Sequence, residues 1–263
     1  MAAPSTQVLT DIDDTIKSSG GIAIASIPLG GVDASYQRGA FYPGVFAFQL
    51  ELSCANRPVP PLARADEQPP RVAVLTARAD ELRWALEIKP DSKLARRFAE
   101  AGKARELDWG VGPVLYGSVQ EWVCQERKGL RKFLNFERLY ERAPARRRYV
   151  FCGDNGSSEK DLEAATRIID AHPAVVRAVF LHAVSSSEQP APLPADGRYR
   201  GVPVLYFRTY ATAAAKAAEL GLLDAAALSR VLDAVESDAC LDRTNLAPGM
   251  LNEQLLGAEV RAA

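Results

Sequence analysis

Histidine and cysteine are scarce in this chain, and their scarcity excludes several kinds of functional site. The 263 residues include two histidines and four cysteines, and the cysteines are far apart with no CxxC pair. Because a zinc site needs clustered histidine and cysteine ligands, we do not expect zinc. Scattered cysteines in a chain without a recognisable secretory signal predict a reducing compartment, so we expect a cytoplasmic protein.

Long apolar runs and an excess of one charge are also missing. No run approaches the roughly 18 apolar residues that a membrane-spanning helix needs, so no transmembrane segment is expected. The net charge of −1 provides no basic field to attract nucleic acid. A chain of 263 residues can bury one good core. We predict a single domain over residues 1–263, with the core in residues 5–237 and a tail in residues 238–263.

Short apolar runs alternate with amphipathic segments along the chain. The predicted buried strands are residues 8–10, 72–76, 113–116, 149–152, 178–182 and 204–207. The predicted helices are residues 79–89, 128–142, 162–172, 211–220 and 225–235. The proline-rich residues 57–70 and 188–203 are predicted to be surface loops. This alternation predicts an α/β fold with a doubly wound, mostly parallel sheet and helices on both faces.

The most informative segment is residues 7–17, where an apolar run ends in an acidic cluster. Asp11 and Asp13 are two positions apart, and the hydroxyl of Thr15 follows them. Positions i and i+2 of an extended strand face the same way, and ligands of open α/β sheets bind at the carboxyl edge. Crowded carboxylates repel each other unless a cation, a shared proton or a reacting group compensates. The segment therefore predicts a site for a divalent metal and a phosphate.

Two other interpretations of the acidic segment fail. A calcium-binding loop that began at Asp11 would need glycine at its sixth position and glutamate at its twelfth. The chain has Ile16 and Ile22 at those positions. Residues 11–14 also match a short acidic motif of some terpene cyclases, but those proteins are all-helical and this motif follows a predicted strand.

Thr76 and Lys128 are candidates for phosphate contact. Thr76 ends a predicted strand, where its hydroxyl would either contact a phosphate or cap the next helix. Lys128 begins a predicted helix, where a cation opposes the helix dipole unless an anion lies nearby. Arg131 and Lys132, on the same helix, are predicted to lie on a solvated basic face.

Asp154 follows another predicted strand, in the sequence Gly153-Asp154-Asn155. The glycine permits a tight turn, and the turn would bring Asp154 to the same sheet edge as Asp11. Glu159 and Asp161 have two interpretations: support of the metal, or stabilisation of the first turn of the next helix. The GxxxxGK pattern of a nucleotide-binding P-loop is absent.

The order of acid pair, hydroxyl, lysine and Gly-Asp resembles the haloacid dehalogenase-like phosphatase superfamily. The matching positions are Asp11, Asp13, Thr15, Thr76, Lys128 and Asp154. Residues 11–17, 41–44 and 151–161 look like the actin-patch-type phosphatidate phosphatase catalytic domain. Two features depart from that family: the segment at residues 157–160 is longer, and Leu-Thr-Ala-Arg at residues 75–78 replaces Ser-Asn-Ser-Pro.

This resemblance implies a magnesium-dependent phosphatase that forms an aspartyl-phosphate. It implies Asp11 as the nucleophile and Asp13 as the acid that protonates the leaving group and later activates water. The implied metal ligands are Asp11, the backbone carbonyl of Asp13, and Asp154, with Asp161 as a further candidate. Thr76 and Lys128 would stabilise the phosphoryl oxygens. No large cap domain is expected.

Residues 20–48 bear on the substrate, because they are rich in glycine, apolar and aromatic residues. They are predicted to form either a flap or lipid-contacting surface, or a hairpin and helix packed into the core. The first alternative would suit phosphatidate at a membrane surface, with the protein bound peripherally. A soluble phosphomonoester or a phosphoprotein is the alternative substrate.

A non-catalytic, receiver-like module that binds phosphate or metal is the alternative of another class. A receiver carries its phosphoacceptor aspartate on a middle strand. Here the corresponding strand ends in Tyr116-Gly117-Ser118, without an aspartate. The receiver interpretation is therefore disfavoured.

Overall fold

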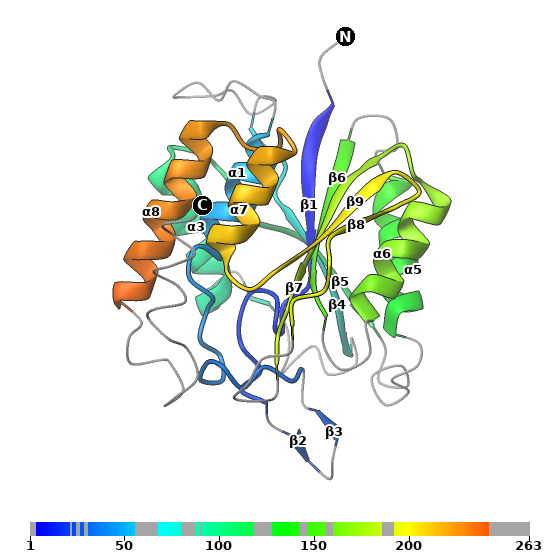
Figure 1. The fold of residues 1–263 in the computed structure, drawn as a ribbon, viewed down its shortest axis with the longest axis horizontal. Coiled ribbons are helices and arrows are strands. Elements are labelled where there is room, and N and C mark those ends of the chain that lie inside the picture. Colours follow the sequence, from blue (N-terminus) through cyan, green and yellow to red (C-terminus); the bar gives the residue numbers. More distant parts are fainter. Residues whose placement is uncertain are drawn as a thin grey trace.

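The computed structural model describes residues 4–21, 23–24, 27–28, 31–55, 68–79, 88–89, 91–117, 128–142, 147–155, 160–185 and 192–241. Within these residues, seven strands form one sheet with helices on both faces (Figure 1). The predicted α/β fold with a mostly parallel sheet is confirmed, and it is compatible with a Rossmann-like arrangement.

The strand order of the described sheet is β5-β4-β1-β6-β7-β9-β8. The parallel strands are β1 (Ser5–Thr10), β4 (Val72–Ala79), β5 (Val111–Gly117), β6 (Arg147–Asp154), β7 (Val176–His182) and β9 (Val202–Phe207). Each of the six predicted strands is present. β8 (Gly197–Tyr199) pairs antiparallel with β9, so residues 188–203 are not only a loop as predicted.

Both faces of the sheet are buried, which explains the continuous apolar runs. On one face lie α1 (Val45–Cys54), α3 (Lys93–Ala104), α7 (Tyr210–Glu219) and α8 (Ala225–Leu241). On the other lie α5 (Lys128–Tyr140) and α6 (Lys160–Ala171). Within β1, Val8 packs on the first face and Leu9 on the second. None of the helices that the structure describes is long and apolar enough to cross a lipid bilayer.

Four of the five predicted helices correspond to α5, α6, α7 and α8. The fifth, residues 79–89, lies almost wholly outside the described residues. Its first residue, Ala79, belongs to β4. Helix α3 was not predicted, and α1 overlaps only the end of residues 20–48, where a helix was one of two alternatives. α3 begins after Ser92, whose side chain accepts a hydrogen bond from the Ala95 N–H at 3.2 Å.

The aromatic side chains of residues 20–48 belong to the core. Those of Tyr36, Phe41, Tyr42, Phe46 and Phe48 are all at most 8% exposed. They pack around α1, as the core alternative predicted, so the prediction of a lipid-contacting aromatic surface is wrong. A small hairpin of β2 (Ala23–Ile24) and β3 (Ile27–Pro28) lies at the end of the molecule toward which β1 runs (Figure 1).

Candidate functional site

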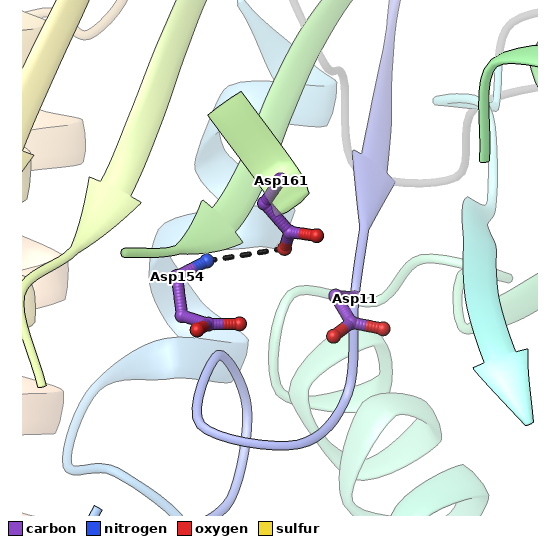
Figure 2. A group of neighbouring side chains, drawn as sticks. All are labelled: Asp11, Asp154 and Asp161. Atoms are coloured by element: carbon purple, nitrogen blue, oxygen red, sulfur yellow. Dashed lines mark hydrogen bonds between the residues drawn. The ribbon is translucent and has the colours of Figure 1, made fainter. Parts of the chain in front are cut away.

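Three carboxylates converge at the carboxyl edge of the sheet (Figure 2). Asp11 directly follows β1, Asp154 ends the neighbouring parallel strand β6, and Asp161 lies in the first turn of α6. One carboxylate oxygen from each of the three lies within 4.8 Å of the others. The Asp154 N–H donates to Asp161 Oδ2 at 3.1 Å. The prediction that Asp11 and Asp154 share one sheet edge is confirmed.

The lysine in contact with these carboxylates is Lys132. Its Nζ lies 3.1 Å from Asp11 Oδ2 and also donates to Asp161 Oδ1. The residue is 3% exposed. The prediction that Lys132 lies on a solvated face is therefore wrong, and the direct contact predicted for Lys128 belongs to Lys132. The two lysines are four positions apart on α5, so they share a side of the helix and Lys132 lies one turn further along.

Lys128 nevertheless lies within electrostatic range of the site. Burial lowers its pKa to about 8, with the positive charges of Lys160 and Lys132 adding to the effect. The carboxylates of Asp11 and Asp13 oppose this shift. Lys128 therefore adds positive charge near the site, in addition to the buried ammonium of Lys132.

The carboxylates are held in an environment that resists their ionisation. Burial raises the pKa of Asp11 to about 6, and Asp161 and Asp13 contribute, while Lys132 opposes the rise. Burial, Asp161 and Asp11 also raise the pKa of Asp154 well above its usual range. Burial alone would lower the pKa of Lys132, but the carboxylates of Asp11, Asp161 and Asp154 outweigh it and raise that pKa.

This donor set fits a divalent cation. When all three carboxylates are ionised, they and the Lys132 ammonium carry a formal charge of −2, which one divalent ion would neutralise. The ligand atoms are all oxygens, the donors that hard cations such as Mg²⁺ and Ca²⁺ prefer. Asp11, Asp154 and Asp161 are the residues that could hold such an ion.

Asp13 and Thr76 were also predicted to belong to the site, and the Asp13 carboxylate is close enough to Asp11 to raise its pKa. The Asp13 side chain is 18% exposed, and one of its oxygens lies 3.9 Å from Lys17 Nζ. Thr76 is 2% exposed and lies within β4, two residues beyond Val74, the partner of Thr10 in β1. β4 continues to Ala79, so the alternative prediction that Thr76 caps a helix is wrong. The pairing of β4 with β5 becomes irregular after Leu75, at the level of the site.

Asp14 organises the loop that follows the first two acids, and the sequence argument gave it no role. Its buried carboxylate accepts backbone N–H groups from Ser19 at 2.8 Å, Val32 at 2.5 Å and Asp33 at 2.9 Å. Its own backbone has a left-handed φ of 60°, which aspartate tolerates better than most residues. The imidazole Nδ1 of His182, at the end of β7, lies 2.7 Å from the Asp14 carbonyl oxygen. The sequence offered one sign of this role: Asp14 is a third acid directly after Asp13, and aspartate side chains often accept hydrogen bonds from nearby backbone N–H groups.

The two remaining sequence candidates are Thr15 and Glu159. The Thr15 side chain is buried, and its hydroxyl has no hydrogen-bond partner in the described part of the chain. The Tyr210 hydroxyl donates to the Thr15 carbonyl at 2.5 Å, so the backbone here is fixed. Glu159 lies outside the described residues.

Comparison of the chain with protein-family models, with curated proteins and with solved structures finds no match. The fold and the site together define an α/β protein with a buried acidic cluster and one lysine at the carboxyl edge of its central strands. Its function is therefore inferred from that site.

Proposed function

We propose that this protein is a magnesium-dependent phosphatase of the haloacid dehalogenase-like type, which hydrolyses a phosphomonoester through an aspartyl-phosphate. The observation that carries the proposal is the convergence of the Asp11, Asp154 and Asp161 carboxylates with the Lys132 ammonium. This convergence lies where the adjacent parallel strands β1 and β6 end, the usual ligand position of open α/β sheets.

Asp11 would act as the nucleophile. Its carboxylate attacks phosphorus, and the bond between phosphorus and the ester oxygen breaks as the Asp11–phosphorus bond forms. Only the ionised form can attack, and the ammonium 3.1 Å from Asp11 Oδ2 favours that form against the effect of burial. Lys132 takes the role that the sequence had given to Lys128, and it would also stabilise the phosphoryl oxygens.

Asp13 would transfer the protons. It lies two residues after the nucleophile and keeps partial access to solvent. A group that exchanges protons with a departing alkoxide and an arriving water needs such access. Protonated Asp13 gives its proton to the leaving oxygen, and ionised Asp13 then accepts a proton from the water that attacks the acyl phosphate.

Mg²⁺ would be held by Asp11 and Asp154, with the Asp13 carbonyl as a further donor, and would offset the repulsion between nucleophile and phosphate. Asp161 bonds to both Lys132 and the Asp154 N–H. We therefore assign to Asp161 the positioning of these two groups in addition to its carboxylate near the ion. Thr76 remains the proposed hydroxyl donor to the phosphoryl group.

The proposed substrate class is a phosphomonoester, without a specified alcohol. Phosphatidate was suggested by the resemblance of residues 11–17, 41–44 and 151–161 and by the apolar residues 20–48. The burial of five aromatic side chains from residues 20–48 in the core weakens the second of these supports. Phosphatidate is therefore tested as one candidate substrate together with soluble phosphomonoesters.

The test is phosphate release with Mg²⁺ from p-nitrophenyl phosphate, a sugar phosphate and phosphatidate vesicles. We expect turnover of at least one ester, loss of activity with chelator, and a fall to near background in Asp11→Asn and Asp13→Asn. Asp233→Asn is the matched control, because Asp233 is exposed on α8, and it should keep wild-type activity. Wild-type turnover by Asp11→Asn would exclude the covalent route. Mg²⁺ binding without turnover of any ester would favour a non-catalytic module.

A further inference from the structure

Asp14 carries a buried carboxylate that the proposed reaction does not use. The residue directly follows Asp13, the proposed acid, and is 0% exposed. Both of its carboxylate oxygens accept backbone N–H groups, which belong to Ser19, Val32 and Asp33. Hydrogen bonds to an ionised acceptor are roughly twice as strong as those between neutral groups. Three of them from different directions therefore hold the Asp14 side chain in one orientation.

The three N–H groups come from both sides of the β2–β3 hairpin. We call residues 19–21, which precede the hairpin, and residues 31–34, which follow it, the two stems. The stems lie against each other, since a Cβ added to Gly21 would lie 3.1 Å from Ala34 Cβ. The Asp14 carboxylate therefore connects both stems to the segment that carries the proposed acid.

Gly31 makes this close approach of the second stem possible. A Cβ added to Gly31 would lie 1.9 Å from Asp14 Oδ2, well under the 3.0 Å below which real Cβ contacts essentially never fall. The φ of Gly31 is not left-handed, so alanine adds no backbone strain at this position. Gly31→Ala should therefore push the carboxylate away from Val32 and Asp33 without removing its charge.

The backbone of Asp14 is fixed on both sides as well. Its N–H donates to the Lys17 carbonyl at 2.7 Å, and its carbonyl oxygen lies 2.7 Å from His182 Nδ1. Because a peptide group is planar, the bond from the Asp14 N–H also sets the direction of the Asp13 carbonyl, a proposed donor to Mg²⁺. The left-handed φ of 60° at Asp14 is a conformation that persists where surrounding contacts determine it.

The second stem is itself attached to the core, which gives Asp14 a rigid support. Asp33 is 1% exposed, and its carboxylate accepts a hydrogen bond from the Tyr42 hydroxyl at 2.6 Å. The Ala34 N–H donates to the Ser185 carbonyl, in the segment after β7, at 3.1 Å. A continuous set of hydrogen bonds thus leads from the core, through the second stem and Asp14, to the loop of the proposed acid.

We infer that Asp14 is a positioning residue for the proposed reaction, which fixes Asp13 relative to the nucleophile Asp11 by connecting the loop of Asp13 to both stems. This inference rests on the proposed function, in which Asp13 protonates the leaving oxygen. A displaced acid protonates a departing alkoxide or phenolate poorly. An ester whose leaving group needs no proton depends much less on where the acid lies.

A comparison of two leaving groups tests the positioning of the acid. Asp14→Asn keeps the shape of the side chain but places an NH₂ group against backbone N–H donors. We expect kcat/KM for phenyl phosphate to fall at least roughly tenfold more than kcat/KM for 2,4-dinitrophenyl phosphate, whose phenolate leaves without a proton. Gly31→Ala should show the same difference, and it decides the question if Asp14→Asn does not fold. An equal fall for the two esters would overturn the positioning role.

The matched controls are Asp233→Asn and Gly197→Ala, which should keep the wild-type ratio of the two kcat/KM values. Gly197 is exposed on β8, and a Cβ added there would meet no other atom within 4 Å.

Amide hydrogen exchange tests the connection without any turnover, in the full chain with chelator. Exchange in residues 13–19 and 31–34 should accelerate together, roughly tenfold or more, in Asp14→Asn and in Gly31→Ala. The strands of the sheet should keep their wild-type protection. Acceleration confined to residues 13–19 would overturn the inference, because the carboxylate would then not hold the second stem. If the wild type hydrolyses no phosphomonoester while both segments exchange faster in the variants, the proposed function fails and the connection stands.

Discussion

Lys132 allows three acidic side chains to occupy one small, buried volume. Its ammonium contacts Asp11 and Asp161 directly, and its charge also lowers the pKa of Asp154 against the effect of burial. Without this cation, the carboxylates would have to take up protons or move apart. In the absence of metal, Lys132 is therefore a structural part of the site as well as a proposed catalytic group.

Replacement of Lys132 and of Lys128 by methionine separates the two lysines. Lys132→Met leaves buried carboxylates without a partner, so we expect the free energy of unfolding to fall by about 3 kcal/mol. Lys128→Met should change it by about 0.5 kcal/mol or less, because Lys128 is only partly buried and lies beside other cations. Urea denaturation at pH 7 with chelator measures both values. Equal losses of unfolding free energy in the two variants would mean that Lys132 does not stabilise the buried carboxylates more than Lys128 does.

At the residue scale, the sequence predicted the location of those site residues that directly follow or end a strand. Asp11 and Asp154 each come at the end of an apolar run, and parallel strands bring such ends together. Lys132 was assigned to solvent because the side of α5 that faces the sheet depends on how the helix is rotated about its axis. That rotation is set by packing against β4, β5 and α6, which local sequence does not specify.

At the scale of elements, the strands were predictable, whereas α3 was not predicted and α1 only as one of two alternatives. In α1, Phe46, Phe48, Leu50 and Leu52 alternate with other residues, a pattern typical of a strand. The segment is nonetheless a helix, and nine of its ten residues are buried. Its polar residues find partners there: Glu51 pairs with Arg230 at 2.8 Å, and Gln49 donates to Thr10 Oγ1 at 3.0 Å. Tertiary packing thus overrides the local pattern.

The β8–β9 hairpin provides a prediction at this scale, because Arg200 and Gly201 in its turn have left-handed φ angles of 47° and 85°. Arg200→Asn creates an Asn-Gly turn, the favoured pair for two left-handed residues, so it should raise the free energy of unfolding by about 0.5 kcal/mol. The lost pair with Asp170 lies at the surface and contributes less than about 1 kcal/mol. Arg200→Ala is the control, because it loses the pair but keeps the strain. A gain in Arg200→Ala as large as in Arg200→Asn, measured by urea denaturation, would contradict this explanation.

For the whole molecule, the buried carboxylates make stability depend on pH. The folded-state pKa of Asp11 is about 6, above its usual value of 3.8. Between these two values the unfolded chain loses its proton first, so stability falls as the pH rises through this interval. Above about pH 6 the full loss persists, and for Asp11 it amounts to roughly 3 kcal/mol. The raised pKa of Asp154 acts in the same direction.

Asp11→Asn should therefore be more stable than the wild type at pH 7 in the presence of chelator, by up to about 3 kcal/mol. At pH 4 the two proteins should be nearly equal, because Asp11 is then mostly protonated in the folded state. Added Mg²⁺ should stabilise the wild type more than the variant, since it binds the ionised carboxylate. Urea denaturation at both pH values measures these differences. Parallel stability profiles for Asp11→Asn, the wild type and Asp233→Asn would contradict the prediction.

The central place of β1 in the sheet has a consequence for the newly made chain. β1 leaves the ribosome before the other strands of this sheet, yet Leu9 pairs with Ala73 on one side and Ser5 with Arg147 on the other. At synthesis rates of about 5–20 residues per second, the second partner is made several seconds or more after the first strand. Both edges of this apolar strand lack their final neighbours until β4 is made, and one edge lacks its neighbour until β6 is made. We expect slow folding, as contacts between distant residues require, and a period in which the nascent chain depends on chaperones to avoid aggregation.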